Sequence, residues 1–226
     1  MESKKIKFDY EIVAGEPVDR ILKRSQKYKS DLIVLGITGL GMVGKLLVGS
    51  TTQKILNSTD IPILAVSGNN KREVDIKNVL IPIDIYEPSK KVIDYALDLY
   101  SKTNFNLTLA YVMMVGKDIY EFPEDIINKI TSDTDRDFDK FINSLEKRFN
   151  RRNKKKKIKI NKELMFGLNP GFVINNHCKE NNYDLIILNT HGRKGFKKFI
   201  LGSVANNILS GSGCNVLVLK DEVKSK

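Results

Sequence analysis

The feature that most constrains the fold is an internal repeat. Residues 32–56, LIVLGITGLGMVGKLLVGSTTQKIL, return at 185–209 as LIILNTHGRKGFKKFILGSVANNIL. Adding 153 to each residue number aligns the copies without a gap, and the register extends upstream, where Pro17 matches Pro170. A repeat of this kind marks two copies of one supersecondary unit, each with the same apolar face to bury.

Each copy predicts a strand, a helix, a short apolar strand, a glycine-rich loop, a helix and a strand. The strands and helices are 6–13, 17–28, 31–36, 50–58 and 62–67 in the first copy, and 158–165, 170–182, 184–189, 203–211 and 215–220 in the second. The apolar strands have the uninterrupted hydrophobicity of strands covered on both faces. Ser50 and Ser203 are expected to be N-caps. This alternation predicts an α/β fold with a parallel sheet and right-handed crossovers.

Further elements occur once, between the copies. They are predicted strands at 77–84 and 105–114 and predicted helices at 88–103 and 118–150. Residues 71–226 therefore form a complete five-strand domain, and residues 1–70 form a partial domain that lacks the first two strands. An incomplete sheet leaves costly open edges. Either another chain fills the gap, the half rearranges, or the natural chain begins upstream of Met1.

Composition is that of a globular protein: 226 residues, of which 41% are hydrophobic. The uncharged run at 32–44 is shorter than the roughly 18 to 20 apolar residues of a membrane span, so no membrane partner is expected. The amino terminus MESKKIKFDYEI has no apolar signal region, which favours a cytoplasmic location. Cys178 and Cys214 are too sparse for a disulfide framework, and the histidines show no zinc-like spacing, so no metal site is predicted.

The net charge of +11 suits a polyanion, including a nucleotide polyphosphate. Much of the excess lies in one run, RRNKKKK, at 151–157. This run has no aromatic residues that could stack on bases, and such runs are usually solvated connections. Nucleic acid is therefore an unlikely partner.

The loop of the first copy has the spacing G-x2-G-x9-G-[S/T]: Gly36, Gly39, Gly49, then Ser50 and Thr51. Glycine at the end of a strand is expected to allow a turn with positive φ and close approach of a ligand. A glycine and a serine at a helix start supply amides and a hydroxyl for a phosphate. The spacing is neither a Walker A motif nor G-x-G-x-x-G.

This loop, placed after the fourth strand of a five-strand unit, resembles the ATP-binding signature of the universal stress protein family. The resemblance implies a Rossmann-like (adenine nucleotide alpha hydrolase-like) parallel five-stranded sheet of order 3-2-1-4-5, here in a tandem arrangement. It also implies ATP, with Mg²⁺, as the ligand, and a homodimer or an intramolecular domain pair joined through strand five. These are properties of the family, transferred to this chain as expectations.

Carried over by position, the resemblance assigns the phosphates to Gly36, Gly39, Gly49, Ser50 and Thr51, and in the second copy to Gly192, Gly202 and Ser203. The base and ribose are assigned to Pro82 and Asp84 in LIPID, with Val112 near the end of the second strand. Asn189 stands where the first copy has Gly36, and asparagine is the best non-glycine occupant of a positive-φ position. The first half thus has the loop without the first strand, and the second half has the first strand with an altered loop.

Two classes of function follow. One is a stress-response and signalling protein that binds an adenine nucleotide, with at most slow or partner-dependent hydrolysis. The other is an interaction module of the same fold that pairs through 62–67 and 215–220 and binds no nucleotide. An enzyme is the third choice, because no paired carboxylates, Ser-His-Asp set or Cys-His set stands out.

Overall fold

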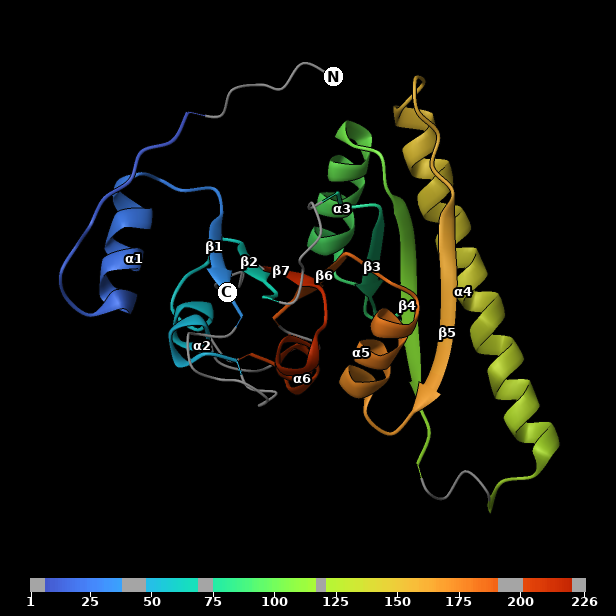
Figure 1. Ribbon diagram of the computed structural model, residues 1–226. Helices are drawn as coiled ribbons and strands as arrows, with labels where there is room; N and C mark the ends of the chain where they lie inside the picture. Colours follow the sequence, from blue (N-terminus) through green and yellow to red (C-terminus); the bar gives the residue numbers. More distant parts are fainter. Residues whose placement is uncertain (1–6, 38–47, 69–74, 117–120, 191–200, 221–226) are drawn as a thin grey trace, which may run out of the picture.

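The computed structural model describes residues 7–37, 48–68, 75–116, 121–190 and 201–220 (Figure 1). In chain order the elements are α1 (Pro17–Lys27), β1 (Ile33–Gly36), α2 (Ser50–Leu56), β2 (Ile63–Val66), β3 (Asn78–Pro82), α3 (Lys90–Lys102), β4 (Asn106–Met114), α4 (Glu124–Arg152), β5 (Ile160–Gly167), α5 (Pro170–Glu180), β6 (Leu185–Asn189), α6 (Ser203–Gly211) and β7 (Asn215–Leu219). The α/β alternation is confirmed. Proline opens α1 and α5 as predicted.

All seven strands form one sheet of order β1-β2-β7-β6-β3-β4-β5. Counted from β3, the five strands of the second half lie in the order 3-2-1-4-5. Neighbouring strands are parallel except β2 and β7, which pair antiparallel, with Ile63 opposite Val218 and Ala65 opposite Val216. The expected five-stranded sheet is thus part of a larger mixed sheet, in which the first half adds two strands to one edge.

The helices cover the sheet unequally. On one face, α1, α2, α5 and α6 enclose a core that joins the two halves, with Ile55 and Ile63 of the first half packed in the same cluster as Ile208 and Val218 of the second. On the other face, α3 and α4 cover the strands of the second half. The first half therefore shares its core with the second instead of having its own.

The expectation that both apolar strands are covered on two faces is right for one and wrong for the other. The first four residues of β6 are buried, whereas in β1 Ile33 is buried and Val34 is 56% exposed. The reason is that the described residues of the first half include no counterparts of α3 and α4. Within this part of the chain, no helix covers one face of β1.

The strand predicted at 6–13 is a second correction, since the described residues 7–14 are irregular. Their counterparts in the repeat are the residues of β5, which pair with β4 along eight positions. The first half has no equivalent of β4, and a strand without a neighbour leaves its backbone groups unpaired. The apolar side chains of this segment are consequently exposed: Phe8 is 83%, Tyr10 87% and Ile12 94% exposed.

Polar contacts also join the two halves. The side-chain oxygen of Asn215 accepts a hydrogen bond from the amide of Ser67 at 3.2 Å. The ammonium of Lys220, which is 4% exposed, donates to the carbonyl of Leu56 at the end of α2. Burial lowers the pKa of Lys220, and the carboxylate of Asp60 opposes that shift. A buried cation at the carboxyl end of a helix satisfies an otherwise unpaired carbonyl and interacts favourably with the helix dipole.

Candidate functional site

Strands β3 and β6 mark the point where the order of the sheet reverses. They are parallel neighbours, with Val79 opposite Leu185 and Leu80 opposite Ile186. From β3 the chain adds β4 and β5 on one side, and β6 and β7 follow on the other. In open α/β sheets, ligands bind outside the carboxyl ends of the strands at this reversal. The fold therefore indicates the ends of β3 and β6 as the ligand site.

A cavity of about 50 Å³ lies at these strand ends. Its lining contains Pro82, Ile83, Asp84, Glu87, Ser89, Val92 and Asn189. Pro82 and Asp84 were predicted from the sequence, and Asn189 was singled out by the repeat. Glu87 and Ser89 were not predicted, because they belong to no motif. Ser89 precedes an amphipathic helix, and that N-cap position is the signal that identifies it.

Local hydrogen bonds fix the walls of this cavity. A side-chain oxygen of Asp84 accepts from the amide of Tyr86 at 3.0 Å, which forms an Asx turn. Ser89 caps α3 by accepting from the amide of Val92 at 3.4 Å. The start of α3 thus forms part of the cavity wall, beside the carboxylates of Asp84 and Glu87.

In both copies one backbone hydrogen bond joins the two ends of the glycine-rich loop, and we call this joined part the neck of the loop. The amide of Gly49 donates to the carbonyl of Ile37 at 2.9 Å, and the amide of Gly202 donates to the carbonyl of Thr190 at 2.9 Å. Gly49 and Gly202 are the N-caps of α2 and α6, and neither helix has a side-chain cap. Ser50 and Ser203 were predicted as caps and are instead the first helical residues. Amides in the first turn of a helix have no partner within the helix and can bind an anion.

The positive φ expected at Gly36 and at Asn189 is wrong. These residues end β1 and β6 and are paired in the sheet, Gly36 with Val66 and Asn189 with Leu219. Among the described glycines, Gly15 is the one with positive φ, at 124°. The difference between the copies is therefore one of side-chain volume: Asn189 contributes a side chain to the cavity wall, where Gly36 has none.

The remaining predicted residues are placed unequally. Ser50 and Thr51 begin α2, a helix of seven residues beside β1. No described strand lies on the open side of β1, so nothing equivalent to Pro82 and Asp84 faces them. Val112 is 7% exposed, packs in the core and is not part of the cavity wall. Gly39 and Gly192 lie outside the described residues.

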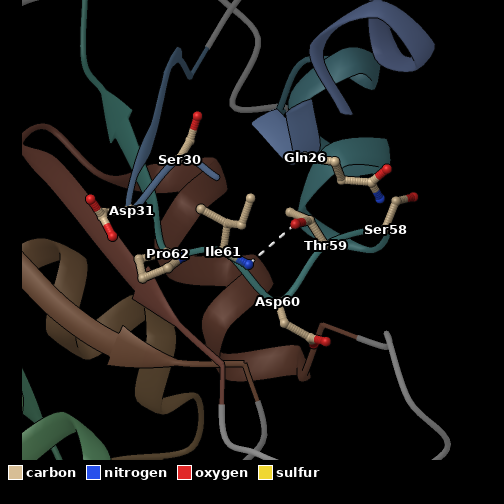
Figure 2. A pocket seen from close by; sticks show the side chains of 8 residues that line it. All are labelled: Gln26, Ser30, Asp31, Ser58, Thr59, Asp60, Ile61 and Pro62. Carbon is tan, nitrogen blue, oxygen red and sulfur yellow. Dashed lines mark hydrogen bonds between the residues drawn. The ribbon is translucent and has the colours of Figure 1, made fainter. Parts of the chain in front are cut away.

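A larger open hollow of about 530 Å³ lies at the amino ends of β1 and β2 (Figure 2). It is lined by Gln26, Ser30, Asp31, Ser58, Thr59, Asp60, Ile61 and Pro62, none of which was predicted as a site residue. Asp31 is the repeat counterpart of Asp184, whose carboxylate accepts from the amides of Lys77 and Asn78 at 2.9 Å. Asp31 has no such partner strand among the described residues, and it lines the hollow instead.

The two cysteines are free and buried, as expected for reduced thiols. A hydrogen bond with Cys214, together with burial, raises the pKa of Cys178. Within the described parts of the chain, no group of three or more histidine, cysteine, aspartate or glutamate side chains could hold a metal ion. Nor does any helix among those residues have the length and apolar character needed to cross a membrane.

Comparisons with known proteins identify relatives along nearly the whole chain. The model of the universal stress protein family matches residues 2–67 and 75–220. A universal stress protein of Mycolicibacterium smegmatis is 23% identical over 215 residues, which cover 92% of this chain and 67% of that protein. The universal stress protein YxiE of Bacillus subtilis is 28% identical over 152 residues, which cover 63% of this chain and 97% of that protein.

A solved structure is similar in fold. The crystal structure of a universal stress protein from Archaeoglobus fulgidus has a TM-score of 0.63 and 22% sequence identity, and the match covers 91% of this chain and 67% of that one. The chain thus spans about two thirds of the length of this protein and of the M. smegmatis relative. At this identity the structural likeness supports the fold alone.

Proposed function

The chain belongs to the universal stress protein family, and from this premise we propose that it is a stress-response and signalling protein whose second half binds ATP with Mg²⁺. The observation that carries the proposal is the cavity at the ends of β3 and β6, where Pro82 and Asp84 lie beside the amino end of α3. The order of the strands reverses at this point, as it does at ligand sites of other α/β sheets.

Each site residue has a role in this proposal. Pro82 and Asp84 contact the adenosine, with Asp84 accepting a hydrogen bond from the ribose. Gly202, Ser203 and the first amides of α6 receive the phosphates, and Gly192 belongs to the same loop. The fit is supported at Gly202, where a Cβ atom would lie 3.1 Å from the carbonyl of Thr190 and crowd the neck of the loop. Mg²⁺ is held chiefly by the phosphates and water, as is usual for this ion.

The first half is proposed to bind no nucleotide. Gly36, Gly39, Gly49, Ser50 and Thr51 keep the loop motif, but no described strand lies on the open side of β1 to hold the adenosine. In this proposal the motif closes the neck of the loop and begins α2, and it holds no ligand. This gives one nucleotide per chain.

Nucleotide binding is proposed to act through contacts and not through turnover. Binding would act on β6 and α6, which both pack in the core shared by the two halves. The strand-five pairing expected of the family lies within one chain, between β2 and β7. A homodimer therefore needs a surface other than these two strand edges.

One observation favours the alternative, an interaction module without nucleotide. The cavity volume of about 50 Å³ is far below the roughly 300 to 1,000 Å³ of pockets that enclose small ligands. The side chain of Asn189 contributes to this small volume. In this alternative the glycine skeleton serves the fold alone.

Thermal unfolding with and without Mg-ATP tests the proposal. ATP at about 100 times its dissociation constant is expected to stabilise the parent protein by about 2.7 kcal/mol, and Asp84→Ala is expected to lose most of that gain. Asp31→Ala is the matched control, since it removes an exposed aspartate that does not line the cavity. Equal stabilisation of the Asp84→Ala variant and the parent would contradict the role given to Asp84.

A further inference from the structure

The connection between α4 and β5 carries a dense group of cations. Six exposed side chains make up this group, which we name the basic corner: Arg151, Arg152, Lys154, Lys155, Lys157 and Lys159. They lie within nine consecutive residues at the carboxyl end of the long helix α4, at the upper tip of the molecule in Figure 1. The predicted solvated connection is therefore a compact positive surface.

The backbone of the basic corner is held in place by Lys156, a half-buried cation of the run that turns inward, and the ammonium of Lys157 donates to the carbonyl of Asn150 at 3.0 Å. The ammonium of Lys156 donates to the carbonyl of Tyr100 at 2.6 Å, to the carbonyl of Thr103 and to the side-chain oxygen of Asn104 at 3.0 Å. It also lies 4.2 Å from the centroid of the Tyr100 ring. A lysine used in this way ties the connection to the end of α3.

Residues after Lys156 continue the anchoring. Ile158 and Ile160 are buried, and their amides donate to the side chains of Asn150 at 2.9 Å and Glu146 at 2.6 Å. Inward residues thus alternate with the outward Lys157 and Lys159. The cations are presented by an ordered turn and not by a flexible linker.

The charge of the basic corner is not neutralised by the protein itself. Along the described residues, none of its six cations is ion-paired with a carboxylate, whereas Lys162 pairs with Asp135 and Asp139, and Arg148 pairs with Asp94. Like charges this close repel one another and lower stability. Binding of an anionic partner relieves this repulsion among the cations, which adds to the free energy of binding at the basic corner.

We infer that the basic corner docks on an anionic lipid surface. Four of its six cations are lysines, which act as point charges and lack the fork that arginine uses for fixed phosphate or carboxylate geometry. Both helices that end here, α3 and α4, end with carbonyls, so backbone amides do not form a phosphate pocket. The nearby ring of Tyr100 is already covered by Lys156, which leaves no aromatic platform for bases. Long lysines on a projecting tip suit the diffuse negative charge of lipid headgroups.

This inference departs from the expectation that the chain has no membrane partner. That expectation rested on the lack of an apolar span, and a peripheral electrostatic contact needs no such span. The basic corner also lies at the amino end of β5, opposite the carboxyl ends that form the candidate nucleotide site. Docking therefore leaves that site open, and the inference does not depend on nucleotide binding.

Co-sedimentation with vesicles tests the inference on the full chain. The parent is expected to bind phosphatidylcholine vesicles that contain phosphatidylglycerol and not vesicles of phosphatidylcholine alone, and high salt should abolish binding. The variant with Lys154, Lys155, Lys157 and Lys159 all changed to glutamine should bind several hundred-fold more weakly, because each cation near an anionic membrane contributes roughly fivefold. The matched control changes Lys23, Lys27, Lys54 and Lys129 to glutamine. It has the same net charge and should bind within about fivefold of the parent.

Three results would overturn the inference. The first is that the parent does not bind the anionic vesicles. The second is that both variants lose binding equally, which would make net charge the cause. The third is that duplex DNA binds the parent more tightly than the vesicles do and depends on the same four lysines, which would assign the basic corner to nucleic acid. Circular dichroism of each variant checks that loss of binding is not loss of fold.

Discussion

Replacing Gly202 by valine is expected to weaken ATP binding by roughly 100-fold, the cost of losing one or two charge-assisted hydrogen bonds. A Cβ atom at this position lies 3.1 Å from the carbonyl of Thr190, so a branched side chain forces the neck of the loop apart. It also covers the first amides of α6, which are the proposed phosphate donors. The measurement is calorimetric titration with Mg-ATP.

The repeat provides the control for this variant. Gly49 is the counterpart of Gly202, with the same N-cap position and the same amide-to-carbonyl bond at 2.9 Å. Gly49→Val should leave ATP affinity unchanged if the first half binds no nucleotide. Ser203→Ala, a change with little effect on backbone space, should weaken binding in the same direction as Gly202→Val. If Gly49→Val lost affinity and Gly202→Val kept it, the site would belong to the first half.

Ile63→Ala is expected to cost about 2 to 5 kcal/mol of stability, the range for deleting most of a buried aliphatic side chain. Ile63 is 0% exposed and lies opposite Val218 in the only strand pair that joins the halves along the described sheet. Since the first half shares its core with the second, loss of this contact should release β1 and β2 first. Urea unfolding measures the change in the free energy of unfolding, and native-state hydrogen exchange shows which strands lose protection.

The control for Ile63→Ala is Val34→Ala on the neighbouring strand. Val34 is 56% exposed, so its truncation should change stability by no more than about 0.5 kcal/mol. The amides of β3 and β4 should keep their protection in Ile63→Ala. Equal loss of protection in β3 and β4 would mean that the two halves unfold as one unit, which would contradict the earlier release of β1 and β2.

The elements that the sequence predicted well are those whose partners are also present in the chain. Pro17 and Pro170 open helices in both copies, because a proline at the first turn is a local signal. Residues 7–14 and β5 occupy the same positions of the repeat and differ in outcome, because only β5 has a strand beside it. Strand formation depends on a neighbour far away in the sequence, and a local pattern does not report whether that neighbour exists.

The candidate site was predicted in part for the same reason. The resemblance assigned Pro82 and Asp84 to the site, and the structure places Pro82 at the end of β3 and Asp84 just after it, both in the cavity wall. Val112 was placed at the site by resemblance and is in the core, since its side chain points to the face covered by α5. Glu87 and Ser89 reach the cavity through the turn before α3, and a turn of this kind has no spacing that marks it as part of a site.

The most direct test of the central claim is the stoichiometry of Mg-ATP binding to the full chain, measured by calorimetric titration. In the proposed function the complete site lies at the ends of β3 and β6, and the first half has none. Saturable binding of one nucleotide per chain is therefore expected. Two equivalent sites per chain would contradict the division between the halves, and no binding at millimolar ATP would leave the chain as an interaction module.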